Sequence, residues 1–147
     1  MVATAFCGSL FLATTTATRV ESRTVADAQL RKYTELVRSV EYEPCANPTI
    51  STEPPTNAGS SSYNWSSTGA PLNTVGWVQN IEFGTPDLSN VNDLKIVWQA
   101  RSASTCNSGD TTKDPGLQRV TLAIRVAGSP DTTLTAQVIK RTPNGVT

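Results

Sequence analysis

Residues 19–40 read RVESRTVADAQLRKYTELVRSV, and this stretch decides the fold. Its apolar residues recur at spacings of four, three, four and three, at Ala26, Leu30, Tyr33, Val37 and Val40. Such spacings place side chains in one stripe along an α-helix, and Val25 and Leu36 widen that stripe. The pattern predicts a helix that packs on a folded domain through this stripe.

Charged residues in the same stretch alternate in sign from Arg19 onward. Asp27 and Arg31 form an i,i+4 pair, and Glu35 and Arg38 form an i,i+3 pair. Neighbours at these spacings meet on the surface of a helix, so we expect both pairs on the solvated side.

The helix is expected to run without a break from Ala5 to about Glu41. No proline interrupts this stretch. Pro44 disfavours a helical conformation at Glu43, so the helix should stop near Tyr42.

The first half of this helix, Met1–Thr18, contains no charged residue. Threonines and small residues make it a weak membrane span, and it lacks the basic start of a signal peptide. An apolar helix without a partner in its own chain implies a membrane or further copies of itself. The alternative is a degenerate signal segment that is removed on export. The expected filament or membrane contacts are Phe6, Leu10, Phe11 and Leu12.

Four later stretches alternate apolar and polar residues, which predicts strands of an antiparallel sheet with one buried face. They lie at 75–83, 94–99, 119–126 and 134–139. The helix stripe and this face each need an apolar partner. The sequence therefore predicts an α+β fold, with a long N-terminal helix on a small antiparallel sheet of about four strands. The expected divisions are an apolar helix part (1–18), an amphipathic helix part (19–43), a polar surface loop (44–72) and the sheet (73–147), with 19–147 forming one globular domain.

The composition excludes several function classes. The chain has no histidine, which removes the commonest general base and metal ligand. Its formal net charge is zero, so it carries no electrostatic footprint for nucleic acid. We find no catalytic constellation and no cofactor motif, and we predict that the chain is not an enzyme.

Two loop features allow a binding role. The carboxylates of Asp110 and Asp114 could hold Ca²⁺, although Lys113 lies between them and an ordinary solvated turn is the alternative. Tyr63 and Trp65, in a possible short strand at 62–66, either anchor a loop on the core or, if exposed, bind a ligand together with Trp77.

The three cysteines are Cys7, Cys45 and Cys106. The economical prediction is a disulfide between Cys45 and Cys106, both in polar, loop-like surroundings. Closing a loop of roughly sixty residues would stabilise the fold by about 4 kcal/mol and would imply an oxidising compartment. Two free thiols in a cytosolic protein are the alternative.

The chain resembles type IV pilins and pseudopilins, the prepilin-type proteins of bacteria. An apolar helix runs into an amphipathic one, followed by a neck, a variable loop, an antiparallel sheet and a disulfide. LVRSVEYEPC at 36–45, GLQRVTL at 116–122 and VIKR at 138–141 look like actinobacterial members. The family's processing motif, a Gly followed by Phe-Thr-Leu and a Glu, does not occur. Either the chain is not a processed pilin or the motif lies before Met1, and a filament subunit predicts that the DNA just upstream encodes it in frame.

The resemblance implies a structural subunit of a type IV pilus-like or type II secretion-like filament. Its partners would be other pilin-like subunits, an inner-membrane assembly platform and an ATPase. It would lie in the cell membrane before assembly and in a cell-surface filament afterwards. The alternative function is a secreted or surface-anchored β-rich binding module with a degenerate export signal.

Overall fold

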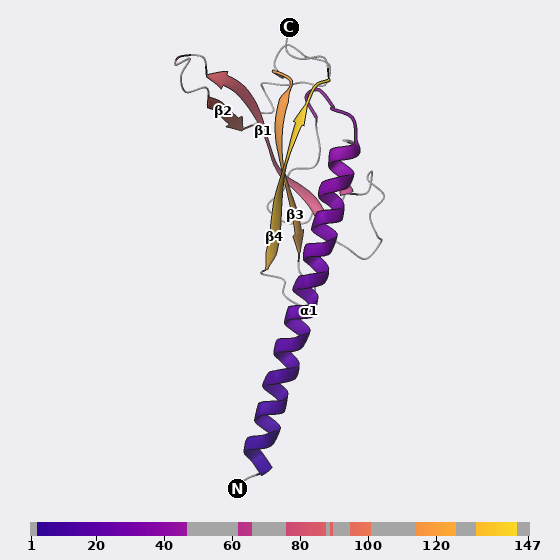
Figure 1. Ribbon diagram of the computed structural model, residues 1–147, viewed down its shortest axis with the longest axis vertical. Helices are drawn as coiled ribbons and strands as arrows, with labels where there is room; N and C mark the ends of the chain where they lie inside the picture. The colour runs from indigo at the N-terminus through magenta and orange to yellow at the C-terminus, as the bar shows by residue number, and fades with distance from the viewer. Residues whose placement is uncertain are drawn as a thin grey trace.

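The computed structural model describes residues 3–46, 62–65, 76–87, 89, 95–100, 114–125 and 132–143, with the helix side chains described at residue 17 and from residue 19 onward. These residues form one long helix and a four-stranded antiparallel sheet (Figure 1), which confirms the predicted α+β class. The elements are α1 Ala3–Ser39, β1 Gly76–Asp87, β2 Lys95–Ala100, β3 Leu117–Arg125 and β4 Thr133–Arg141.

The sheet has the strand order β2-β1-β3-β4, and every neighbouring pair is antiparallel. All four predicted strands are present. The predicted buried face holds for β3 and β4. For β2 the prediction is wrong, because this edge strand is largely exposed. Figure 1 shows the reason, since β2 lies on the side of the sheet away from α1.

The core forms where α1 crosses β3 and β4. Within the stripe, Ala26, Leu30, Tyr33 and Val37 are buried and Val40 is partly buried. They pack in one cluster with the inner face of the sheet, which presents Val78, Ile81, Phe83, Val120, Leu122, Ile124 and Val138. Each fully buried large side chain of this kind contributes roughly 1.5–3 kcal/mol. Val25 does not join the cluster, because it is 50% exposed, so the stripe is narrower than predicted.

The first strand contains a β-bulge that the alternation did not predict. The register of β1 against β3 shifts between Val78 and Asn80. An extra residue in one strand reverses the face of every side chain beyond it. Trp77 therefore pairs with Ala123 on the outer face, whereas Ile81 and Phe83 face the helix. Simple alternation over 75–83 predicts that Trp77 shares a phase with Ile81 and Phe83, and this prediction is wrong because of the bulge.

The helix ends at Ser39, three residues before the predicted stop. The amide of Val40 still donates to the carbonyl oxygen of Leu36, and the Ser39 hydroxyl donates to the same oxygen. Beyond this point the carbonyls of the last turn accept from a side chain of β4. The end is therefore set by a tertiary contact as well as by Pro44.

Candidate functional site

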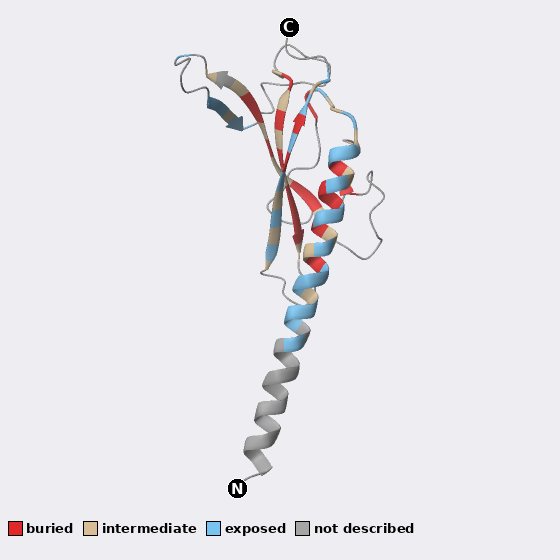
Figure 2. Cartoon of the chain, in the orientation of Figure 1, coloured by how far each residue is buried: buried red, intermediate tan, exposed pale blue. Residues whose placement is uncertain are grey.

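The first half of α1 extends well beyond the sheet, so the molecule has the shape of a small domain on a long stalk (Figure 1). The part of this stalk nearest the sheet is solvent-facing on nearly all sides (Figure 2). Val20 is 61% exposed, and its charged neighbours Arg19, Glu21 and Arg23 are also exposed. This projecting helix, defined as residues 3–25, is the candidate assembly surface.

The predicted contacts Phe6, Leu10, Phe11 and Leu12 all fall in the projecting helix. Their side chains lie outside the described part of the structure, so their role stays a prediction. No helix within the described residues combines the length and the apolarity needed to cross a membrane.

Residues 40–46, here called the neck, follow the C-terminal end of α1 and are fixed by the carboxylate of Asp114. One oxygen accepts a hydrogen bond from the amide of Cys45 at 2.8 Å, and Gln118 Nε2 donates to the same oxygen at 2.6 Å. The other oxygen accepts from the Tyr42 hydroxyl and from the amide of Gly116 at 3.0 Å. Hydrogen bonds to a charged group are about twice as strong as neutral ones. This one loop residue therefore ties the neck to the start of β3.

The backbone at Cys45 needs such support. Its φ of 51° lies in the left-handed region, which costs a residue other than glycine roughly 1–2 kcal/mol. Cys45 is also disulfide-bonded. Cys7 cannot be its partner, because it lies about 48 Å from Ser39 at ~1.5 Å per helical residue, and bonded Cα atoms lie within about 7 Å. The predicted partner Cys106 lies outside the described residues, so that pairing stays a prediction.

The C-terminal end of α1 is capped by Lys140 of β4. Its ammonium group donates to the carbonyl oxygens of Val37 at 2.9 Å and Arg38 at 3.2 Å, and also to that of Val40. A cation at a helix C-terminus also interacts favourably with the helix dipole. Lys140 is only 6% exposed, and this desolvation lowers the pKa of its ammonium group. The last strand thus holds the end of the first helix.

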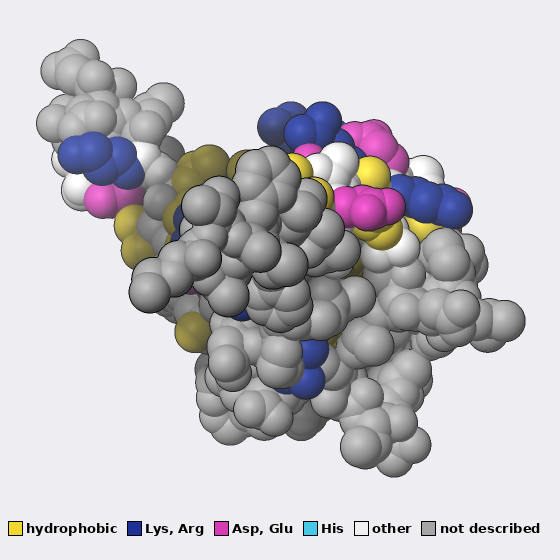
Figure 3. Space-filling model, turned by 90° about the horizontal axis from the view of Figure 1, so that it is seen from below, with side chains coloured by type: hydrophobic (Ala, Val, Ile, Leu, Met, Phe, Trp, Pro, Cys, Tyr) yellow, Lys and Arg dark blue, Asp and Glu magenta, His cyan; other side chains and the backbone are white. Residues whose placement is uncertain are grey.

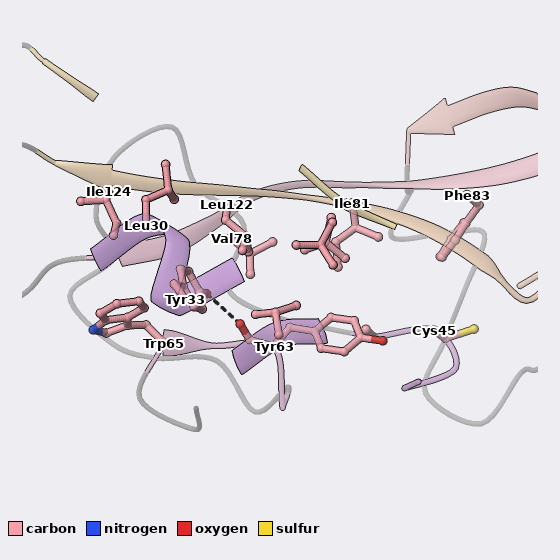
Figure 4. Close-up of a cluster of buried hydrophobic side chains, with 14 of the residues drawn as sticks. Leu30, Tyr33, Cys45, Tyr63, Trp65, Val78, Ile81, Phe83, Leu122 and Ile124 are labelled. Atoms are coloured by element: carbon pink, nitrogen blue, oxygen red, sulfur yellow. Dashed lines mark hydrogen bonds between the residues drawn. The ribbon is translucent and has the colours of Figure 1, made fainter. Parts of the chain in front are cut away.

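A short segment at 62–65 contacts both α1 and the neck (Figure 4). The Tyr33 hydroxyl donates to the carbonyl oxygen of Tyr63 at 2.7 Å, and the ring of Tyr33 meets that of Trp65 edge to face at 4.4 Å. The Tyr63 hydroxyl accepts from the amide of Glu43, whose carboxylate accepts from the amide and hydroxyl of Ser62. The segment is a turn and not the strand suggested by the sequence, because its hydrogen bonds go to the helix and the neck.

The aromatic residues considered for ligand binding are all buried. Tyr63 and Trp65 anchor their segment on the core, and Trp77 is only 2% exposed on the outer face. The hypothesis that these three form an exposed binding surface is therefore wrong. Trp98, which is partly exposed, lies against Gly84 and has the Arg119 guanidinium 4.6 Å from its ring centre.

Of the two carboxylates in the possible calcium loop, the structure describes only that of Asp114. Asp110 lies outside the described residues. Both oxygens of Asp114 accept hydrogen bonds from groups of the neck and of β3. The structure thus gives Asp114 a positioning role that the sequence did not indicate. Lys140 was also missed, although it shares its phase in β4 with the buried Val138.

Three tyrosines around the neck make the fold sensitive to alkali. Burial is the main cause that raises the pKa of Tyr33 and of Tyr42, and it raises the pKa of Tyr63 to about 12. The unfolded chain therefore releases these protons near pH 10, while the folded chain keeps them. Stability should be intact below pH 10 and should then fall, with a limiting slope of about 4 kcal/mol per pH unit for three protons.

The lowered pKa of Lys140 has the opposite effect on stability, since it makes the folded protein more stable as the pH rises. This effect ends at about pH 10.5, the ordinary pKa of lysine, above which the folded and the unfolded chain have both lost the proton. The net loss should therefore become steep above about pH 10.5. Urea unfolding followed by circular dichroism between pH 8 and 12 measures it. The variant Tyr33→Phe should remove one proton from the slope, and a flat profile up to pH 12 would contradict the prediction.

Within its described residues the chain is an α+β domain with one long helix, whose second half packs on an antiparallel sheet while its first half projects beyond the sheet. Comparisons of the chain with protein-family models, curated protein sequences and solved structures find no match.

Proposed function

We propose that this chain is a structural subunit of a bacterial type IV pilus-like or type II secretion-like filament, and that it assembles through its projecting helix. The single observation that carries the proposal is the exposure of α1 below the sheet, where Val20 and Val25 face solvent. A helix with exposed apolar side chains gains free energy when another helix covers it.

Three further features support a pilin-like fold for this subunit. The helix precedes the sheet in the chain and packs on β3 and β4 through Ala26, Leu30, Tyr33 and Val37 of its second half. The neck is anchored by Asp114 and Lys140, which would hold the domain at a fixed angle to the helix. The family resemblance of the sequence supplies the expected partners, namely other pilin-like subunits, a membrane platform and an ATPase.

Assembly of the purified full chain on dilution from a mild detergent tests this proposal. The wild-type chain should form long assemblies in the electron microscope and sediment at high speed. Phe11→Asp should raise the concentration needed for assembly at least about a hundredfold, because a buried, unpaired carboxylate costs several kcal/mol.

Thr135→Asp is the matched control, because it introduces the same charge at an exposed position of β4. It should assemble like the wild type. A wild-type chain that stays monomeric at every concentration, or a Phe11→Asp variant that assembles normally, would contradict the proposal.

A further inference from the structure

The edge strand β2 is open to solvent on both of its faces. Five of its six residues are exposed, and Trp98 is partly exposed. Ile96 and Val97, which are neighbours in the strand, have 47% and 43% of their surface exposed. In the sheet order β2-β1-β3-β4 only one edge of β2 has a described strand beside it. The backbone groups along its other edge can therefore pair with a further strand.

The position of β2 leaves this edge within reach of another chain. Residues 82–87 of β1 pair with residues 95–100 of β2, and these paired ends project from the rest of the molecule as an arm (Figures 1 and 3). Figure 3, in which the arm extends to the left, shows hydrophobic side chains on its surface. The helix packs on β3 and β4, so the described part of α1 lies away from the arm.

The usual devices that protect an edge strand are missing from β2. Natural sheets discourage pairing at their edges with proline, with a β-bulge or with charged side chains along the strand. The segment Lys95–Ala100 contains no proline, and its only charged residue is the first one. Its register against β1 runs without a shift over the whole strand. This strand thus has the properties of a surface that binds a further strand through backbone hydrogen bonds and alternate side chains.

The apolar side chains of β2 are divided between its two faces. Ile96 and Trp98 lie on the same face, because a Cβ atom added to Gly84 would lie 2.8 Å from an atom of each. Val97 points to the opposite face, since successive side chains alternate along a strand. Both faces of β2 therefore offer apolar side chains to a partner strand.

The sequence of β2 is complementary to itself in one antiparallel register. Residues that lie directly opposite each other in such a pair point to the same face, so the register can shift only in steps of two. When Val97 lies opposite Val97, Ile96 lies opposite Trp98 on both sides of it, and Lys95 lies opposite Gln99. Apolar residues then meet apolar residues, and no like charges meet. A shift by two residues places Val97 opposite Gln99 or Lys95 and removes this match.

From this arrangement we infer that β2 of one copy pairs antiparallel with β2 of a second copy, about a two-fold axis at Val97. The two sheets then form one continuous sheet. Neighbouring strands lie about 4.8 Å apart, so the β3 strands of the two copies are separated by five spacings, or about 24 Å. A helix is about 10–12 Å wide, which leaves room for both helices where they cover their own strands. The contact is isologous and closes as a dimer. It uses the sheet, so it goes beyond the proposed function and does not depend on it.

Charges placed on the two-fold axis test the pairing in the full chain. Size-exclusion chromatography with light scattering, in the mild detergent that prevents filament assembly, measures the mass at increasing concentration. The wild type should change from monomer to dimer. Val97→Lys and Val97→Asp should each raise the dissociation constant at least about tenfold, because like charges meet at the axis. An equimolar mixture of the two should recover to within about threefold of the wild type, since lysine then faces aspartate.

Thr135→Lys is the matched control, because it adds the same charge at an exposed position of β4. It should dimerise like the wild type, and circular dichroism should show that all variants are folded. A wild type that stays monomeric up to about 1 mM, or a Val97→Lys variant that dimerises like Thr135→Lys, would overturn the inference. A mixture that does not recover would mean that β2 pairs with a different strand, which also overturns the two-fold pairing.

The variant Phe11→Asp separates this dimer from the proposed filament. It should dimerise like the wild type, because the contact lies in the sheet, although it should not assemble into filaments. A dimer that Phe11→Asp abolishes would be held by the helix, and the pairing of β2 would be overturned while the filament proposal stands. A wild type that dimerises but forms no filament would contradict the filament proposal alone.

Discussion

Replacing Lys140 with methionine should lower the free energy of unfolding by about 3 kcal/mol. The change removes three hydrogen bonds from an ammonium group to the carbonyl oxygens of Val37, Arg38 and Val40. A hydrogen bond to a charged group contributes about 1.5–3 kcal/mol, and relief of the desolvation of the charge offsets part of the loss. Methionine keeps most of the packing volume, so the effect reports the cap and not a cavity. Urea unfolding followed by circular dichroism measures it.

Arg141→Met is the control for this experiment. It removes a positive charge from the adjacent residue, which is exposed at the end of the same strand. Surface changes of this kind stay within about 0.5 kcal/mol. Hydrogen exchange should also quicken at the amides of the last turn of α1 in Lys140→Met alone. Equal urea midpoints for the two variants would show that the cap contributes nothing.

Replacing Asp114 with alanine should destabilise the protein by about 3–4 kcal/mol. The substitution leaves four donors of the neck and of β3 without their acceptor, among them the amides of Cys45 and Gly116. A buried donor without a partner costs about 1–3 kcal/mol, although water will reach some of these groups. Asp114→Asn should lie between alanine and wild type, because the amide keeps one acceptor oxygen. Chemical unfolding at pH 7 measures all three proteins.

Asp27→Asn provides the comparison for the asparagine variant. Asp27 is a carboxylate on the helix surface whose ion pair with Arg31 is open to solvent. Such a pair contributes at most about 1 kcal/mol. A double-mutant cycle between Asp114→Ala and Tyr42→Phe should show coupling of about 1 kcal/mol or more. If Asp114→Asn were as stable as Asp27→Asn, the carboxylate would not be what holds the neck.

The parts of the fold that follow from local periodicity could be predicted from the sequence. The spacing of Ala26, Leu30, Tyr33 and Val37 places them on one side of a helix whatever the rest of the chain does. Strict alternation in β3 and β4 likewise defines which side chains face inward. In both cases the period of the backbone converts sequence spacing directly into direction.

Features that depend on distant residues could not be predicted in this way. The bulge between Val78 and Asn80 has no glycine or proline to mark it. The role of Asp114 depends on Tyr42 and Cys45, which precede it by 72 and 69 residues. Trp65 belongs to a polar, loop-like stretch, and its contact with Tyr33 of the helix brings it into the core.

The contact between Lys140 and the end of α1 has a consequence for the order in which the molecule is made. The lysine and its three acceptors are separated by 100 to 103 residues, so the ribosome completes the helix long before it adds the cap. Contacts this far apart form late, because a long loop must close first. A nascent or truncated chain that lacks its last strand would leave the helix end uncapped and the neck unsupported. The neck therefore becomes fixed only after β4 has been synthesised and has packed against the end of α1.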